Sequence, residues 1–285
     1  MSDTPIPQNA RPVYNAPSAR LADRFRAALG DLADGWRRRE LWSALAVEDL
    51  RQRYHGTALG MAWAVLSFAL FVGIFILVFG VFGDRDLKTF SVHVSAGWLV
   101  WSFISSLITG GATAFSKAGA WIAGTAMPYS TFIYRNVLIE LLLAAAASLV
   151  VGGVLIAVSP PSSPVALLAF PGFALCVAFG FFAALSLAVV CLRLKDLRFV
   201  TQVVVRAAFF LTPILWQYDP TSDSFRTKLA LYNPVTHFLE IVRAPLTGVA
   251  PTTLNYAVAL GSTVAVAIFA ISVFAAFRRR IPLWA

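Results

Sequence analysis

Charge is what this sequence has least of. Only 13% of its 285 residues are charged, whereas about a quarter is usual for a soluble domain, and 59% are hydrophobic. Mean hydropathy is +0.74. This balance excludes a soluble globular protein and predicts an all-α protein that crosses a membrane several times. The net charge of +9 does not indicate nucleic-acid binding, because membrane proteins collect lysine and arginine in their cytoplasmic loops.

Cysteines and catalytic motifs are also scarce. The two cysteines, Cys176 and Cys191, lie in apolar runs and have neither zinc-ligand spacing nor an evident disulfide role. The sequence contains no GxxxxGK[ST] loop for nucleotide phosphates, no HExxH and no GxSxG. We therefore expect no metal, no cofactor and no catalytic residues in this chain. The first 60 residues lack the apolar stretch of a signal peptide, so the first span is expected to direct insertion.

Six stretches are long and apolar enough to cross a bilayer as helices, which takes about 20 residues. They are residues 61–82, 92–112, 137–158, 165–191, 199–218 and 254–277. The second and fifth are the most polar. Lysine and arginine number 17 on the side of the two termini and 5 on the other side. This asymmetry predicts cytoplasmic termini in a multi-pass protein of the inner (plasma) membrane.

The chain before the first span divides into two parts. Residues 1–20 are rich in proline, asparagine and serine and predict a disordered cytoplasmic tail, whereas 21–60 predict cytoplasmic amphipathic interface helices. Residues 61–285 form the single transmembrane domain. If 41–54 is helical, one broad face carries Trp42, Ala46, Val47, Leu50 and Tyr54. Such a helix would lie on the membrane surface, although an ordinary leader into the first span is the alternative.

Two connections are more than plain loops. The cytoplasmic connection, 116–136, has room for a short helix at 118–126 that stops before Pro128. The outer region, 219–253, contains an apolar half, LALYNPVTHFLEIVRAPLTG, which prolines interrupt and which is too short to cross. This pattern favours a re-entrant hairpin or an interfacial helix pair over a soluble loop.

Charges and aromatic rings within the spans are candidates for function. Glu140 and Arg206 are the charges inside spans three and five, and they are either a structural pair or part of a substrate site. Aromatic side chains in spans two and five form either an interfacial belt or a surface on which sugar rings slide. The aromatic candidates are Trp98, Trp101, Phe209, Phe210, Trp216 and Tyr218.

Four sequence blocks resemble a known family. They are DLRQRYHGTALGMAW at 49–63, RLKDLRFV at 193–200, FFLTPILW at 209–216 and LYNPVTHFLEIVRAPLTG at 231–248. These blocks are similar, in the same order, to the permease subunits of ABC-type polysaccharide exporters, most closely to the O-antigen (lipopolysaccharide) branch. Capsule and teichoic-acid permeases share the plan. The segment GAWIAGTAMPYSTFIYRN is more apolar than the basic segment that is common at this place in the family.

The resemblance implies six spans, a homodimer and two separate ATPase subunits that bind ATP and Mg. It also implies export of a polysaccharide carried on undecaprenyl diphosphate. Residues 116–136 would be the segment that couples to the ATPase and 219–253 the outer gate. The implied coupling residues are Glu48, Lys117, Trp121 and Arg135. The implied gate residues are Asn233, Pro234, His237, Glu240 and Arg243.

Basic residues before the first span lie where a lipid diphosphate would meet the inner leaflet. Phosphate binding competes here with simple anchoring of the positive side. The lipid-diphosphate candidates are Arg37, Arg38, Arg39, Arg51, Arg53, Tyr54 and His55. The sequence thus predicts the transport subunit of an exporter rather than an enzyme. Exporters of small molecules, a membrane-embedded lipid transferase and a proton-coupled transporter are the alternatives, and the last two lack the polar or acidic clusters they need.

Overall fold

A computed structural model describes residues 21–81, 86–158, 163–218 and 221–285 of the chain. The predicted tail 1–20 lies outside these residues. All regular structure in the described ranges is helical, so the all-α prediction is confirmed. The elements are α1 (Leu21–Arg37), α2 (Arg39–Tyr54), α3 (Ala62–Phe75), η1 (Ile76–Val81), α4 (Leu87–Lys117), α5 (Gly119–Gly124), α6 (Ser130–Val158), η2 (Pro164–Leu168), α7 (Ala169–Arg193), α8 (Leu197–Leu211), α9 (Phe225–Tyr232), α10 (Pro234–Leu246), α11 (Thr253–Phe277), η3 (Arg278–Arg280) and α12 (Ile281–Trp284).

Within the described ranges, five helical segments are long and apolar enough to cross a membrane. They are Ala62–Val81, Leu87–Lys117, Ser130–Val158, Pro164–Arg193 and Thr253–Trp284. They coincide with predicted spans one, two, three, four and six. The second and third are longer than predicted, because each helix continues through polar residues at its ends.

The predicted fifth span, 199–218, differs from the structure. Its helix is α8, which has 15 residues and a length of about 22 Å. The helix ends because Thr212 precedes Pro213, and the residue before a proline is driven into extended backbone. Thr212 indeed has φ −97° and ψ 137°. The count of six spans therefore stays a prediction.

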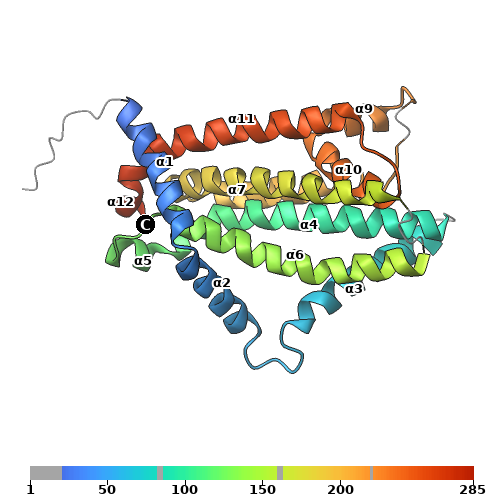
Figure 1. Ribbon diagram of the computed structural model, residues 1–285, viewed down its shortest axis with the longest axis horizontal. Coiled ribbons are helices and arrows are strands. Elements are labelled where there is room, and N and C mark those ends of the chain that lie inside the picture. Colours follow the sequence, from blue (N-terminus) through green and yellow to red (C-terminus); the bar gives the residue numbers. More distant parts are fainter. Residues whose placement is uncertain (1–20, 82–85, 159–162, 219–220) are drawn as a thin grey trace, which may run out of the picture.

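The centre of the bundle is the pair α4 and α7, and Figure 1 shows these helices running with α6 and α11 along the long axis of the molecule. Glycines let the central backbones approach closely. A Cβ atom on Gly111 of α4 would lie 2.4 Å from the Cα of Ala184 in α7. A Cβ on Gly172 of α7 would lie 2.4 Å from the carbonyl oxygen of Ile241 in α10. Helix α7 thus holds both α4 and α10.

The two ends of the bundle carry different short elements. Helices α1, α5 and α12 gather at one end together with the C terminus, which we call the inner end (Figure 1). Helices α9 and α10 lie at the opposite, outer end. The short helix predicted at 118–126 is present as α5. The connection that contains it runs only from 118 to 129, because α4 extends to Lys117 and α6 begins at Ser130.

Helices α2 and α3 form a V whose point stands away from the bundle (Figure 1). The turn between them needs Gly56 and Gly60, whose φ values are +75° and +52°. Helix α2 packs on α6 through buried Ala46 and Leu50. Val47 does not share this face, contrary to the prediction: its side chain is exposed, because it lies about 100° around the helix from Ala46.

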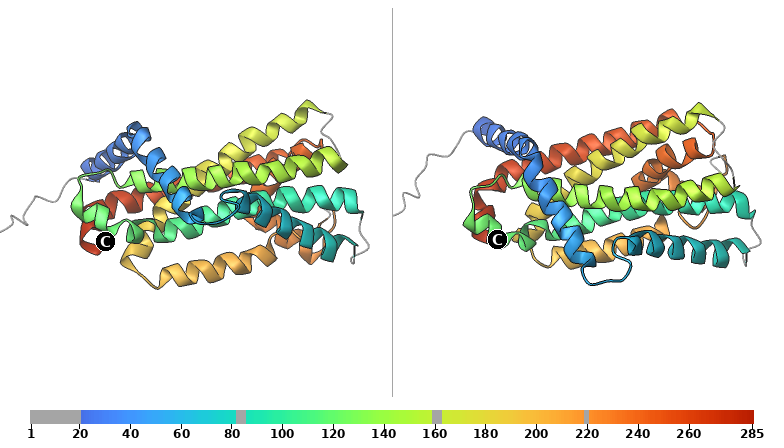
Figure 2. Two further views of the ribbon diagram at one scale, coloured as in Figure 1. Left: turned by 90° about the horizontal axis from the view of Figure 1, so that it is seen from below. Right: turned by 60° about the horizontal axis from the view of Figure 1, so that its bottom comes forward.

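Helix α8 lies at the side of the bundle, as both views in Figure 2 show. It packs mainly against α4, and none of its residues is buried. Large apolar side chains such as Phe199, Val203 and Phe210 remain exposed on it. Apolar exposure of this kind fits a helix that faces lipid or another membrane subunit.

Candidate functional site

A network of buried polar side chains at the outer end is built on α10. Residues at the start of this helix carry local helix-initiation signals. Asn233 is its N-cap, since its Oδ1 accepts the N–H of Val235 at 3.0 Å, and Pro234 takes the first helical position, where no N–H is needed. His237, Glu240 and Arg243 follow at three-residue spacing and point to one broad side of the helix.

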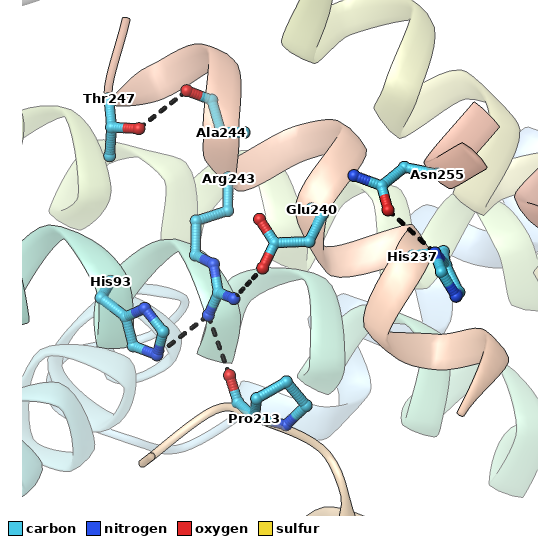
Figure 3. A network of polar contacts seen from close by, with 8 residues as sticks. All are labelled: His93, Pro213, His237, Glu240, Arg243, Ala244, Thr247 and Asn255. Atoms are coloured by element: carbon cyan, nitrogen blue, oxygen red, sulfur yellow. Dashed lines mark hydrogen bonds and ion pairs between the residues drawn. The ribbon is translucent and has the colours of Figure 1, made fainter. Parts of the chain in front are cut away.

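Arg243 is the centre of the network (Figure 3). Its side chain is only 5% exposed. Nη1 donates to the carbonyl oxygen of Pro213 at 2.9 Å and to Nε2 of His93 at 3.0 Å, while Nη2 donates to Oε1 of Glu240. Arginine can only donate, so His93 must accept at Nε2 and carries its ring proton on Nδ1. One buried guanidinium therefore joins α4, α10 and the segment that follows α8.

Two further side chains of α10 hold its neighbours. Nε2 of His237 lies 2.9 Å from the carbonyl oxygen of Leu231 in α9, and Nδ1 lies 2.8 Å from Oδ1 of Asn255 in α11. Nδ2 of Asn233 donates to Oγ1 of Thr212 at 2.9 Å, at the end of α8. The network thus fixes α10 against four other elements.

A cavity of about 770 Å³ opens beside this network. Its wall includes Thr89, His93, Tyr218, Glu240 and Arg243. Since Glu240 neutralises Arg243, the wall offers hydrogen-bonding groups without a strong net charge. Such a surface suits an uncharged, hydroxyl-rich molecule better than an anion.

Four of the five predicted gate residues make polar contacts at this outer end, and the fifth, Pro234, is the exposed first residue of α10. Their role as a gate stays a prediction. Sequence reasoning missed His93, Thr212, the Pro213 carbonyl and Asn255, which come from other elements. Asn255 stands at the start of span six and His93 at the start of span two, so a polar residue at the outer end of an apolar span was the available signal.

An aromatic cluster lies between α3, α4 and α8. Phe209 of α8 has its ring centroid 5.7 Å from that of Trp98 and 6.0 Å from that of Trp101, both in α4. Phe75 of α3 lies 6.3 Å from Phe209, and Phe71 stacks on Trp98 at 5.5 Å. Four of the six predicted aromatic candidates therefore meet, because the Phe210 ring also lies 5.1 Å from that of Phe209. Helix α3 adds phenylalanines that the prediction did not include.

The position of the cluster bears on its two proposed roles. Trp98 lies 11 residues beyond Leu87, about 16 Å into α4, whereas belt residues stand at span ends. Trp101 is 6% exposed and Phe210 is 71% exposed, so the former packs the core and the latter faces outward. Trp216 and Tyr218 pair with each other at 6.5 Å, outside the cluster.

The predicted lipid-diphosphate residues divide into two groups. The first comprises the three arginines where α1 ends and α2 begins, and the second comprises the residues at the end of α2, about 21 Å away. The arginines in both groups are exposed, and Arg37 lies 3.7 Å from the carboxylate of Asp34. One compact site made from all seven residues is therefore not formed in this structure. The first group is Arg37, Arg38 and Arg39, and the second is Arg51, Arg53, Tyr54 and His55.

Three of the four predicted coupling residues are exposed at the inner side of the molecule. Lys117 ends α4, Trp121 lies on α5, and Glu48 accepts a hydrogen bond from Nε2 of Gln52 at 3.0 Å. Arg135 has another position, because its Nε donates to Oδ2 of Asp49 at 2.6 Å, and its side chain is 24% exposed. It fastens α2 to α6 instead of standing free on the surface.

Asp31 of α1 organises the inner end, and sequence reasoning missed it. Its fully buried carboxylate accepts the N–H groups of Tyr129 and Ser130 at 3.2 and 3.0 Å and the Nε–H of Arg278 at 2.9 Å. It thereby caps α6 from another helix and holds the end of α11. The Arg278 guanidinium also lies 5.5 Å from the centre of the Tyr129 ring, and burial raises the pKa of that phenol.

Glu140 and Arg206 do not form the predicted structural pair. Arg206 is exposed on α8, and no ion pair joins it to Glu140 in the part of the chain that the structure describes. Glu140 is instead half-buried in α6, where it lines a cavity between α3, α4 and α6. The pairing is prevented because α8 packs on α4 rather than on α6.

Comparison with known proteins adds a family to this geometry. A model of the family described as ABC-2 type transporter matches residues 40–247. These residues include α2, the aromatic cluster and most of the outer network. The O-antigen export system permease protein RfbA of Myxococcus xanthus is 26% identical over 212 residues, which cover 72% of this chain and 80% of that protein. The family implies a membrane transport subunit that pairs with an ATPase subunit. The chain belongs to the ABC-2 type transporter family.

Proposed function

We propose that this chain is the membrane subunit of an ATP-driven exporter of a lipid-linked polysaccharide of the O-antigen type. Two copies would form the translocation path in the inner membrane. Two ATPase subunits would bind ATP and Mg at the inner end. The glycan would travel attached to undecaprenyl diphosphate.

One observation carries the proposal: the aromatic cluster lies well inside the spanning helices of a chain similar to an O-antigen export permease. Aromatic faces match the apolar C–H faces of sugar rings and hold them without fixing one register. A polymer that must slide needs this tolerance. The uncharged character of the outer cavity agrees with such a cargo.

The elements fit the proposed topology. Helices α1 and α12 lie at the same end, as cytoplasmic termini require (Figure 1). Helix α8 and the non-helical residues 212–218 would together make the fifth of the six crossings. Helices α9 and α10, with 8 and 13 residues, are too short to cross and would form the re-entrant outer gate.

The test is a deletion of this chain in its own organism, followed by analysis of surface polysaccharide. We expect glycan to disappear from the surface and lipid-linked glycan to accumulate inside, with recovery when the intact chain is returned. Surface glycan that persists unchanged would refute the polysaccharide cargo. In parallel, the purified chain should hydrolyse no ATP until the partner ATPase is added. ATP hydrolysis by the chain alone would refute the proposal that a separate subunit hydrolyses ATP.

A further inference from the structure

A carboxylate within a spanning helix needs an explanation. Glu140 lies ten residues into α6, about 15 Å from Ser130 at the inner end of that helix. Such a group is costly inside a membrane and is normally paired or functional. No ion pair satisfies it among the described residues. The residues around Glu140 indicate which kind of ligand could pair with its carboxylate.

Glu140 faces a cavity of about 220 Å³ with a mixed wall. The polar part consists of the carboxylate and the hydroxyl side chains of Ser67, Ser102 and Ser106, with Tyr54 at the α2 side. The apolar part comes mainly from rings and aliphatic side chains of α3, α4 and α6, including Phe68 and Phe103. The wall of the cavity therefore combines oxygen atoms with aromatic rings.

Most oxygens of this wall are acceptors. An ionised carboxylate cannot donate. Ser102 already donates its proton to the carbonyl oxygen of Leu99 at 3.0 Å, and Ser106 hydrogen-bonds the Glu140 carboxylate itself. A complementary ligand must therefore supply donors. A phosphate or diphosphate presents only acceptors and carries like charge, so this cavity does not suit it.

The size and the apolar share of the wall distinguish among donor-bearing ligands. A bare metal cation would need about six or more oxygen ligands at close range. Here one carboxylate and a few hydroxyls line a space far larger than an ion. A pyranose ring has donor hydroxyls on its edge and apolar C–H groups on its face. It matches both parts of the wall.

A row of hydroxyls connects the cavity with the inner end. Along α4 they recur at three- or four-residue spacing over about 21 Å, on one side of the helix. All of them except Ser106 donate to a carbonyl of their own helix. One turn beyond Ser102 comes Trp98 of the aromatic cluster. Nδ2 of Asn136, one turn before Glu140 on α6, is buried without a partner. The row consists of Ser102, Ser106, Thr109, Thr113 and Ser116.

We propose that the cavity at Glu140 binds one sugar residue of the glycan in transit, by hydrogen bonds from sugar hydroxyls to the carboxylate. This cavity is a polar binding site on the path between the inner end and the aromatic cluster. This inference rests on the proposed function and names the part of the path that recognises hydroxyls.

The experiment measures access to the cavity in membranes that contain the full chain and its ATPase. Ser106→Cys is labelled with N-ethylmaleimide in cells that make the glycan and in the same cells blocked before glycan synthesis starts. Ser148→Cys, on another face of α6 and outside this cavity, is the matched control. Both native cysteines are buried, so the unsubstituted chain supplies the background. Ser102→Cys repeats the measurement if Ser106→Cys does not accumulate.

We expect the glycan to slow labelling of Ser106→Cys at least fivefold and to leave Ser148→Cys unchanged. Adding Glu140→Gln, which keeps the size but removes the charged acceptor, should bring labelling in the presence of glycan to within about twofold of the rate without glycan. Equal labelling with and without glycan, or full protection in the Glu140→Gln chain, would overturn the site. The proposed function fails separately, if deletion of the chain leaves surface glycan intact.

Discussion

Glu240 and Arg243 should respond unequally to removal, although they form one ion pair. The Arg243 side chain is 5% exposed, whereas that of Glu240 is 18% exposed and lines the outer cavity. Glu240→Ala leaves a buried guanidinium with only two neutral acceptors, Pro213 and His93. Removing one partner of such a pair costs about 3–5 kcal/mol of unfolding free energy.

Removing Arg243 instead should cost less unfolding free energy than removing Glu240. After Arg243→Met, water in the cavity can hydrate the Glu240 carboxylate, and the apolar side chain fills much of the vacated space. The Pro213 carbonyl and His93 Nε2 lose their donor, which costs about 1–3 kcal/mol. The double variant contains neither charge. Its cost should therefore fall below the sum of the two single costs by more than about 1 kcal/mol.

The assay is equilibrium unfolding of the purified chain in detergent, with all four members of the cycle measured together. Thr247→Ala is the control, because Thr247 is exposed at the end of the same helix and bonds only to Ala244 in Figure 3. It should change stability by less than about 0.5 kcal/mol. Costs that add within about 0.5 kcal/mol would refute the coupling. So would an Arg243→Met cost equal to that of Glu240→Ala.

Three more predictions follow from packing and burial. Gly111→Val should abolish folding, seen as loss of monodisperse protein, whereas Gly152→Val should not, because nothing lies within 4 Å of the Cβ it would gain. Trp101→Ala should reduce the unfolding free energy by about 3–5 kcal/mol, and exposed Phe210→Ala by less than about 0.5 kcal/mol. Asp31→Asn should lower the unfolding free energy by about 2 kcal/mol, because the charged carboxylate that accepts three hydrogen bonds is replaced by a neutral amide.

Features with a local cause were predictable from the sequence. Apolar length located five spans within a few residues at most ends. The motif NPVTHFLEIVR also acts locally, because its cap, its first-turn proline and its charge pair all lie within one helix or at its start. The gate role of its residues comes from the family resemblance and stays a prediction. The short helix of the inner connection could be predicted for the same reason. Each of these features depends on neighbours in the chain.

Features that depend on distant partners were not predictable. Asp31 has partners 98, 99 and 247 residues away, and its own surroundings, LGDLADG, resemble an ordinary surface helix. Arg135 was assigned to the ATPase surface, but its carboxylate partner, Asp49, lies 86 residues earlier. Glu140 and Arg206 are both intramembrane charges by sequence, and only the packing of α8 on α4 shows that they cannot pair.

The fifth span and the outer network share one physical cause. Hydropathy counts the residues of 199–218 but does not register that Pro213 removes an N–H and forces Thr212 into extended backbone. In a continued helix the carbonyl of Pro213 would be bonded to the backbone four residues on. The break frees this carbonyl, which accepts a hydrogen bond from Arg243 at 2.9 Å. The Thr212 hydroxyl accepts a hydrogen bond from the side chain of Asn233. The irregular end of α8 is therefore part of the network that positions α10.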